Sequence, residues 1–240
     1  MRTNMGTANK VERNTNPEAR RVGEFFNNLS PEALSDFEAL ERTSVYPANA
    51  VLFLEKDRPK GIFILHEGRI KLSISSGDGK KLILRVANPG ELLDLTAVMT
   101  GVPYGMTAET QHNCIVGFIR REDFLHFLAK HPDAYQSIVR ELSRNYQRAC
   151  EKLRTVVLSA SAPERLARLL LEWCQSGQQT ESGTRVKISM THEEIGECIG
   201  TSRETVTRTL SDFRHRDLVM LHGSTLMVSN RAALESFAPA

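Results

Sequence analysis

The sequence of 240 residues has few cysteines, no long apolar run and almost no net charge. The four cysteines form no Cys-x-x-Cys pair, so neither a zinc site nor a cysteine-ligated cluster is predicted. We expect all four to be buried as small hydrophobic side chains: Cys114, Cys150, Cys174 and Cys198. A formal charge of +2 provides no bulk positive field, so an anionic partner must be met by a local patch.

No stretch of about 18 apolar residues occurs, and the polar N-terminus lacks the apolar core of a signal peptide. We therefore expect a cytoplasmic protein without a membrane partner. A hydrophobic content of 40% with 25% charged residues is typical of a folded chain of one or two domains.

Apolar periodicity divides the chain into four predicted segments, and the first two are residues 1–22 and 23–130. Residues 1–22 are expected to form a flexible tail. In residues 23–130, a short helix capped by Ser30 precedes brief apolar runs such as IFIL and KLILRV, which Gly, Pro, Asn and Asp separate. Many brief strands with such turns predict an antiparallel sandwich or jelly roll rather than an α/β fold.

The third segment, residues 131–160, is predicted to be a long dimerisation helix. A narrow apolar seam, with Asn145 inside it, follows one side of this helix. The seam consists of Ile138, Leu142, Ala149, Leu153 and Val156. Because it lasts only about three heptads, a helix that packs on its own domain is the alternative.

The fourth segment, residues 161–240, begins where SASAPE interrupts the long helix and Ser161 caps the next one. Two short helices follow in THEEIGECIGTSRETVTRTLSDFRHRDL, and Gly200 separates them. Two helices joined by a tight glycine turn fit a helix-turn-helix.

Each of these two helices is predicted to begin with a capping box. Thr191 with Glu194 would close the first box, and Thr201 with Glu204 the second. Before the first helix, QSGQQTESG is predicted to be a flexible loop. After the second, DLVMLHGSTLMVSN is predicted to be a β-hairpin that turns at residues 222–224.

The second helix, residues 202–215, has two chemically distinct faces. Val206, Leu210 and Phe213 share one side of a helical wheel. The opposing side is predicted to read DNA bases and consists of Arg203, Glu204, Thr207 and Arg208. In the major groove an arginine can donate two hydrogen bonds to guanine, and a glutamate can accept one from cytosine N4.

A merely solvated face is the alternative for the two arginines, and a capping role alone is the alternative for Glu204. The preceding helix carries three glutamates, Glu193, Glu194 and Glu197, so one copy is expected to bind DNA weakly. A dimer would bind more tightly, because its two copies would each contact one half-site.

At these residues the chain resembles the cyclic-AMP receptor protein and FNR (Crp/Fnr) superfamily of bacterial transcription regulators. IGTSRETVTRTL followed by LHGSTLMVS resembles the winged helix-turn-helix of that superfamily. GIFILHEGRIKLSI and NPGELLDL resemble its cyclic-nucleotide-binding-like β-roll. The resemblance covers most of the chain and implies an α+β protein. It would have an N-terminal β-roll sensor domain, a long dimerisation helix and a C-terminal winged helix-turn-helix domain.

By this resemblance the protein is a homodimeric transcription regulator that binds double-stranded DNA. Arg203, Glu204 and Arg208 would read a TGTGA-like palindromic half-site, and Arg203 favours the cyclic-AMP receptor branch because the FNR branch lacks this arginine. The implied phosphate contacts are Thr191, Ser202 and His222. The QSGQQTESG segment lies where relatives contact RNA polymerase, which hints at an activator.

The resemblance is weakest at the effector pocket of the β-roll. The family's phosphate cassette begins with a Gly-Glu pair, matched by Gly90 and Glu91, but its later Arg-Ser pair falls near Tyr104 and Gly105. No arginine or lysine occurs at residues 92–118. A buried cyclic phosphate without a counter-cation would bear a large desolvation cost, so cyclic AMP is not expected to be the effector.

The family's second effector contact, a Thr-Ser pair on the dimerisation helix, falls near Cys150 and Glu151. The alternatives are an unidentified effector or haem, or no small-molecule effector. His112 or Cys114 would then ligate the haem, although a surface role is favoured for His112. No FNR-type iron–sulfur cluster is expected, because the N-terminal 40 residues contain no cysteine.

Three other roles fit the sequence less well. Two kinds of metalloenzyme were considered, but His66 lacks the His-x-His partner of a metal-binding cupin, and Gly196 replaces the second histidine of an HExxH zinc protease. No catalytic residue or metal ligand is therefore predicted. Cys150 could act as a redox sensor, but packing is favoured. The third role is a ligand-binding regulatory subunit whose winged helix contacts protein rather than DNA. Binding of its partner would tolerate Arg203→Ala and Arg208→Ala.

Overall fold

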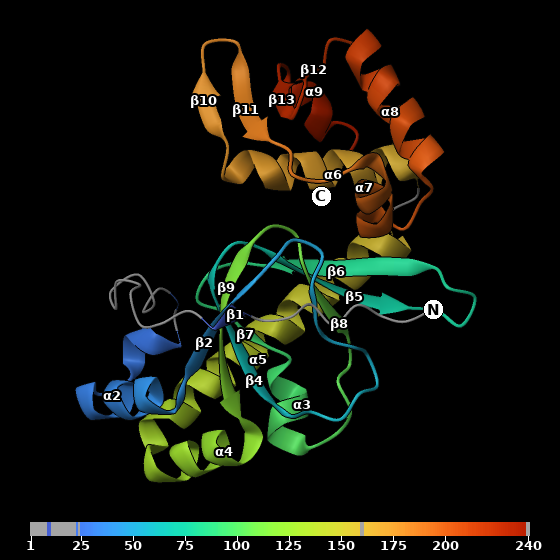
Figure 1. The fold of residues 1–240 in the computed structure, drawn as a ribbon. Helices are drawn as coiled ribbons and strands as arrows, with labels where there is room; N and C mark the ends of the chain where they lie inside the picture. The colour runs from blue at the N-terminus through green and yellow to red at the C-terminus, as the bar shows by residue number, and fades with distance from the viewer. Residues whose placement is uncertain (1–8, 11–22, 24, 159–160, 239–240) are drawn as a thin grey trace. The chain divides into compact units, whose positions relative to one another are not determined.

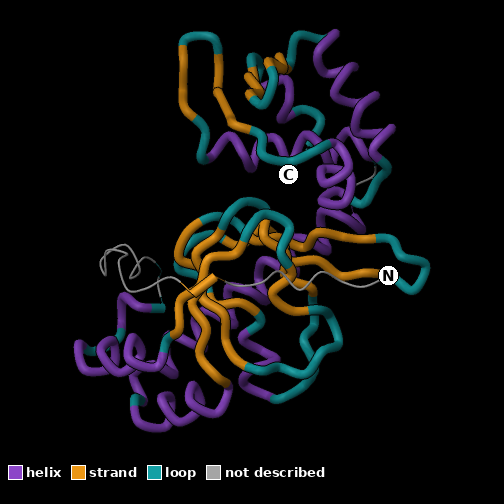
Figure 2. Tube along the Cα trace, in the orientation of Figure 1, coloured by secondary structure: helices purple, strands orange, loops and turns teal. Residues whose placement is uncertain are grey.

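The computed structural model describes residues 9–10, 23, 25–158 and 161–238 (Figure 1). The chain forms two compact units, Met1–Arg148 and Ala149–Ala240. Strands dominate residues 42–120 of the first unit, and helices dominate the second, as the colours of Figure 2 show. The predicted α+β class, with an N-terminal β-roll and a C-terminal helix-turn-helix, is confirmed.

Two antiparallel sheets form the β-roll of the N-terminal unit. One sheet has the strand order β1-β2-β9-β4-β7 and the other β3-β8-β5-β6. The strands are β1 (Asn9–Lys10), β2 (Arg42–Tyr46), β3 (Val51–Phe53), β4 (Gly61–Glu67), β5 (Ile70–Ser75), β6 (Lys81–Ala87), β7 (Leu92–Leu93), β8 (Thr107–Thr110) and β9 (Cys114–Arg120). Buried residues of both sheets, such as Leu65, Leu72 and Val116, meet in one apolar cluster, which is the core of the roll.

Helices surround a second apolar cluster on the outside of β4. They are η1 (Phe26–Asn28), α2 (Pro31–Leu40), α3 (Leu95–Thr100), α4 (Arg121–Lys130) and the first turns of α5 (Pro132–Leu153). Phe37, Phe124 and Phe127 lie at its centre. Ser30 caps α2 as predicted, because its Oγ accepts a hydrogen bond of 3.2 Å from the Ala33 amide.

The predicted flexible tail, residues 1–22, lies outside the described residues except for Asn9 and Lys10. These two residues form β1, in which Asn9 lies opposite Val45 and Lys10 opposite Ser44 of β2. For them the prediction of a flexible tail is wrong, because the edge of β2 offers backbone groups that the N-terminal segment can pair with.

The helix predicted over residues 131–160 consists of α5 and a following π-helical turn, η2 (Arg154–Leu158). Residues 159–160 lie outside the described part. His131 ends α4, so the preceding helical run is not continuous with α5. Proline suits the first turn of a helix, where its missing amide is not needed, which explains why α5 begins at Pro132.

The seam predicted along α5 is not one open side of the helix, because Leu142, like Ile138, packs against the core of the N-terminal unit. Ile138 is buried in the core of the N-terminal unit, and Asn145 is half-buried. The large apolar residues exposed on α5 and η2 are Tyr135, Val139, Tyr146, Leu153 and Val157, which we call the α5 stripe, and of these the predicted seam contained Leu153. Val139 is 61% exposed and Tyr146 72%. The error arose because the apolar residues of α5 serve two faces, one buried on the β-roll and one open.

The two units divide between Arg148 and Ala149, inside α5, rather than before residue 161 as predicted. The reason is that the end of α5 binds the helix-turn-helix. Lys152 Nζ donates a hydrogen bond of 2.6 Å to the Cys198 carbonyl oxygen, and burial lowers the pKa of Lys152. The last turns of α5 therefore belong to the C-terminal unit.

The C-terminal unit packs four helices with a four-stranded sheet of order β10-β11-β13-β12. Its elements are α6 (Ala162–Gln175), β10 (Gln178–Thr180), β11 (Gly183–Lys187), α7 (His192–Ile199), α8 (Arg203–His215), β12 (Val219–His222), β13 (Thr225–Val228) and α9 (Arg231–Glu235). The segment QSGQQTESG is not the flexible loop predicted, because it contains β10, in which Gln178 lies opposite Arg185 of β11. Ser161 caps α6 as expected, accepting from the Glu164 amide.

Candidate nucleic-acid interface

α7 and α8 form the predicted helix-turn-helix. Thr191 Oγ1 accepts a hydrogen bond of 3.2 Å from the Glu194 amide, and the Glu194 carboxylate accepts one of 2.8 Å from the Thr191 amide. The capping box predicted there is confirmed. Gly200 ends α7 with φ of 65°, a left-handed conformation that glycine adopts without strain. A Cβ at Gly196 would lie 2.7 Å from the Thr201 carbonyl oxygen, so the turn packs too closely for a larger residue.

α8 is capped one residue later than predicted. Ser202 Oγ accepts a hydrogen bond of 3.2 Å from the Thr205 amide. Thr201 instead lies within the turn, where its amide donates to the Gly196 carbonyl oxygen. Ser202 is the cap because its backbone is extended, with φ of −81° and ψ of 156°, as an N-cap requires. The capping box predicted between Thr201 and Glu204 is therefore wrong.

The two faces predicted for α8 are confirmed. The buried side chains of the helix are Val206, Thr209, Leu210 and Phe213. The exposed ones include all four predicted base readers, Arg203, Glu204, Thr207 and Arg208. A helix that packs on its domain through one face and exposes hydrogen-bonding side chains on the other can bind in a major groove.

The four predicted base readers differ in what they already bind. Thr207 Oγ1 donates to the Arg203 carbonyl oxygen at 3.0 Å, and His192 Nδ1 lies 2.8 Å from the same hydroxyl. Because the single hydroxyl proton goes to Arg203, His192 Nδ1 must be the donor in the second hydrogen bond. Thr207 therefore connects the start of α7 to the middle of α8.

Glu204 is ionised at the exposed N-terminus of α8. Hydrogen bonds from its own backbone amide and from the Ser202 hydroxyl lower the pKa of Glu204, and the nearby charge of Arg203 acts in the same direction. An ionised carboxylate accepts hydrogen bonds only, which is what a cytosine amino group requires.

The three predicted phosphate contacts lie at the ends of elements. Thr191 and Ser202 are the N-caps of α7 and α8, where free backbone amides and the helix dipole attract anions. His222 ends β12, beside the turn at Gly223 and Ser224 where the sequence predicts it. All three side chains are exposed, so each is accessible to a nucleic-acid backbone.

Glu91, a predicted effector contact, is bound by two arginines that were not predicted to reach it. Arg85 of β6 donates to the Glu91 carboxylate, and Arg148 of α5 donates to it over 3.3 Å. Gly90 turns the chain just before Glu91 with φ of 90°, and its amide donates to the Leu65 carbonyl oxygen. Both arginines lie outside the predicted cassette, and only the fold brings them to it.

Two further carboxylates of the β-roll are held by protein groups. Asp94 accepts a hydrogen bond of 2.8 Å from the Gly105 amide, and burial raises the pKa of Asp94. Glu109 binds Lys71 at 3.0 Å and Lys81 at 3.1 Å. The cations that residues 92–118 lack are thus supplied by β5 and β6, and protein carboxylates already bind them.

The other predicted effector contacts are Tyr104 of the β-roll and the pair Cys150 and Glu151. Tyr104 is a core residue that stacks on Phe53 with a centroid distance of 4.1 Å, and its hydroxyl donates to the Gly61 carbonyl oxygen. Burial raises the pKa of Tyr104. Cys150 and Glu151 lie beyond Arg148 in the C-terminal unit, and both are exposed.

Three of the four cysteines are buried as predicted, and Cys150 is the exception. Burial raises the pKa of the Cys114, Cys174 and Cys198 thiols, the last to about 11. His112, considered as a haem ligand, is exposed. Within the described ranges no group of three or more His, Cys, Asp or Glu side chains could hold a metal ion.

Two family sequence models match the chain. That of the Crp-like helix-turn-helix domain covers residues 164–237, and that of the cyclic nucleotide-binding domain covers residues 43–131. The nucleotide-binding model matches the unit that contains the β-roll, and the helix-turn-helix model matches the unit that contains α7 and α8. The chain belongs to the Crp/Fnr superfamily.

Curated Crp/Fnr relatives are transcription regulators. A CRP-like cAMP-activated global transcriptional regulator from Mycobacterium tuberculosis is 25% identical over 211 residues, 88% of this chain and 94% of the relative. The cAMP-activated global transcriptional regulator CRP of Salmonella typhimurium is 24% identical over 184 residues, 76% of this chain and 87% of the relative. This Crp/Fnr protein is accordingly a transcription regulator and not an enzyme, with a helix-turn-helix that binds DNA.

Solved structures share the fold. FixK2 from Bradyrhizobium japonicum superposes with a TM-score of 0.72 at 18% identity, covering 83% of this chain and 98% of that one. The c-di-GMP responsive regulator CLP of Xanthomonas campestris gives 0.73 at 19% identity, covering 84% and 100%. None of the helices in the described part of this Crp/Fnr chain is long and apolar enough to span a membrane.

Proposed function

We propose that this Crp/Fnr protein is a homodimeric cytoplasmic regulator that recognises a palindromic DNA sequence, with one α8 for each half-site. The observation that carries the proposal is the exposed side of α8, from which Arg203, Glu204 and Arg208 project beside two helix N-termini. A TGTGA-like half-site offers guanines to the arginines and, on its complementary strand, cytosine to the glutamate.

The α5 stripe supports the homodimer. It consists of five large exposed apolar side chains of α5 and η2, and Val139, Tyr146 and Leu153 recur at intervals of one heptad. Exposed apolar surface of this kind is costly in a monomer. A second copy of the same helix would cover it and would supply the second α8 that a palindrome requires.

We also propose that DNA binding does not require cyclic AMP. The support is that Glu91 is already bound by Arg85 and Arg148, so neither guanidinium is available without loss of an ion pair. Relatives include a cAMP-activated regulator and a c-di-GMP responsive regulator, so the effector differs within this fold. As an activator, the dimer would contact RNA polymerase through the turn between β10 and β11.

The experiment that tests the proposal is an unbiased selection of bound duplexes from a random library, with and without cyclic AMP. We expect a TGTGA-like palindrome to be enriched to the same extent in both selections. If no sequence is enriched, and a protein partner is captured instead through the winged unit, the chain is not the DNA reader proposed. Enrichment only with cyclic AMP would contradict the statement about the effector.

A further inference from the structure

The sheet of the C-terminal unit leaves one leucine of its packed face open. Val219, Leu226 and Val228 lie on this face, which packs against α8, and all three are buried. Leu221 of β12 lies opposite Leu226 of β13, so it belongs to the same face, because cross-strand partners share a face of a sheet. Leu221 is nevertheless 41% exposed. Part of the apolar surface toward α8 is therefore not covered by the chain itself.

A cavity of about 180 Å³ lies between this face and α8. Its apolar side is formed by Leu210 of α8 and by Val219, Leu221 and Leu226 of the sheet. One water occupies about 30 Å³ in the liquid, and a methylene group is of similar size, so the cavity has room for about six carbon atoms. Because water gains few hydrogen bonds from leucine and valine, this side of the cavity favours an apolar occupant.

The other side of the cavity is polar and carries an unpaired cation. Arg214 and Ser211 of α8 line this side. Within the described residues, no ion pair or hydrogen bond involves the Arg214 guanidinium or the Ser211 hydroxyl. The neighbouring carboxylate, Asp212, binds Arg216 instead at 3.1 Å. A guanidinium beside a hydroxyl donor suits a carboxylate, so charge complementarity favours an anionic group at this end.

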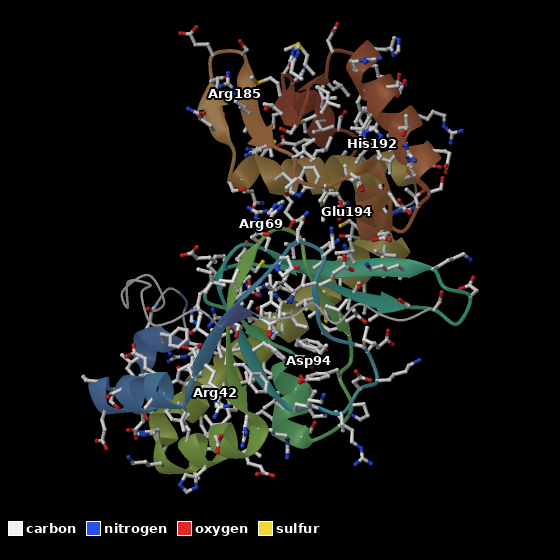
Figure 3. All side chains as sticks on the ribbon, in the orientation of Figure 1. Arg42, Arg69, Asp94, Arg185, His192 and Glu194 are labelled. Atoms are coloured by element: carbon white, nitrogen blue, oxygen red, sulfur yellow. The ribbon has the colours of Figure 1, made fainter. Side chains whose placement is uncertain are left out.

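The polar side of the cavity borders the exposed side of α8. His192 and Thr207 also line it, and the hydrogen bond between them holds the start of α7 against α8. Figure 3 labels His192 at the start of α7. Thr207 lies one helical turn beyond Arg203, and Ser211 lies one turn beyond Arg208. A ligand in the cavity would therefore lie next to the side chains that we propose read DNA.

We propose that this cavity binds a small aliphatic carboxylate of about four to eight carbons, with its carboxylate on Arg214 and Ser211 and its chain on Leu221. An inorganic anion would leave the leucines uncovered, and a neutral apolar molecule would leave Arg214 without a partner. The bound carboxylate places a negative charge beside the exposed side of α8 and so opposes the approach of DNA phosphates. This effect on DNA rests on the proposed function, whereas the binding site itself does not.

Methyl NMR of the full-length protein tests the binding site. The probes are butanoate, hexanoate and octanoate, with hexylammonium as the probe of opposite charge. Arg214→Gln removes the cation of the cavity. Arg216→Gln is the matched control, because it removes the same charge from an exposed residue that does not line the cavity. Circular dichroism checks that both variants are folded.

We expect hexanoate to shift the methyl resonances of Leu221 and Leu226. The dissociation constant should fall about fourfold for each added methylene group until the cavity is filled. Arg214→Gln should weaken hexanoate binding about tenfold or more, and Arg216→Gln should leave it unchanged. Three results overturn the inference: no methyl shift over the millimolar range, equal shifts with hexanoate and hexylammonium, or equal affinities of Arg214→Gln and the unsubstituted protein for hexanoate.

Fluorescence anisotropy with a duplex that carries the selected palindrome tests the effect on DNA. Saturating hexanoate should weaken DNA binding several-fold in the unsubstituted protein and have no effect in Arg214→Gln. Sodium chloride at the same ionic strength is the control, because salt alone weakens DNA binding. Unchanged DNA affinity in a protein whose methyl resonances shift would overturn the link to DNA. If the duplex is not bound even without hexanoate, the proposed function fails, and the methyl titration still decides whether the binding site exists.

Discussion

Single residues of α8 differ in how free their hydrogen-bonding groups are to meet DNA. Arg203 and Arg208 project from the exposed side, whereas the Thr207 hydroxyl is held between the Arg203 carbonyl oxygen and His192. A group whose donor is already engaged gains little from a base. Thr207 is therefore better explained as a residue that positions α8 against α7 than as a reader of bases.

Thr207→Val tests this difference, because valine keeps the shape and removes the hydroxyl. We expect the base preference of the operator to be unchanged and the affinity to fall by about 1 kcal/mol or less, the net value of one hydrogen bond. Arg208→Ala is the comparison. It should relax the base preference at one base pair and weaken the binding free energy by about 1 to 3 kcal/mol. Selection of bound sequences with each variant measures both. A changed base preference in Thr207→Val would make the hydroxyl a direct reader.

Glu109 makes the stability of the β-roll depend on pH. Burial alone raises the pKa of this carboxyl, but hydrogen bonds and charges from Lys71 and Lys81 outweigh it and leave the pKa lowered. A lowered carboxyl pKa stabilises the fold above the ordinary glutamate pKa of about 4.3 and loses that contribution as the pH falls through the folded-state pKa.

Glu109→Gln should cost about 1.5 to 3 kcal/mol at pH 7, the value of hydrogen bonds to charged groups. The free energy of unfolding should also fall less steeply below about pH 4.3 in this variant, because glutamine does not titrate. Urea unfolding followed by circular dichroism at a series of pH values measures both effects. Glu122→Gln, at an exposed glutamate of α4, is the control. Parallel pH profiles for the unsubstituted protein and Glu109→Gln would refute the role given to this ion pair.

At the scale of elements, strands were predictable where apolar residues were dense. IFIL, IKLSIS and KLILRV became β4, β5 and β6, because a buried strand needs such residues. β7 and β10 were missed, since two or three residues carry no periodicity. β7 pairs with β4, which lies much earlier in the chain, so that Phe63 lies opposite Leu93. β10 pairs with β11 directly after it, but its residues Gln178–Thr180 are all polar.

The α5 stripe gives the element-scale prediction. Val139→Glu introduces a charge into the middle of the stripe and should convert the dimer to a monomer at micromolar concentration, because a carboxylate buried in an apolar seam has no partner. Sedimentation velocity measures the change. Gln147→Glu adds the same charge at an exposed position outside the stripe and should leave the dimer intact. A dimer in Val139→Glu would place the interface elsewhere.

At the scale of the whole molecule, the order of the β-roll, long helix and winged helix-turn-helix could be predicted, but the division into units could not. The end of α5 belongs to the C-terminal unit because Lys152 binds the Cys198 carbonyl oxygen, and these residues lie far apart in the sequence. The same holds for Glu91, whose partner Arg148 comes from another element. Contacts between distant residues leave no local signal in composition or periodicity.

The central claim is that the exposed side of α8 reads DNA. The most direct test measures affinity for the selected palindrome, and for each of its single-base-pair variants, with Arg203→Ala and Glu204→Ala. The account predicts that each substitution costs about 1 to 3 kcal/mol and abolishes discrimination at one base pair of each half-site. Arg216 lies just beyond the end of α8 and binds Asp212. Arg216→Ala should therefore keep the full discrimination between base pairs. Unchanged affinity and unchanged base preference in both α8 variants would contradict the account.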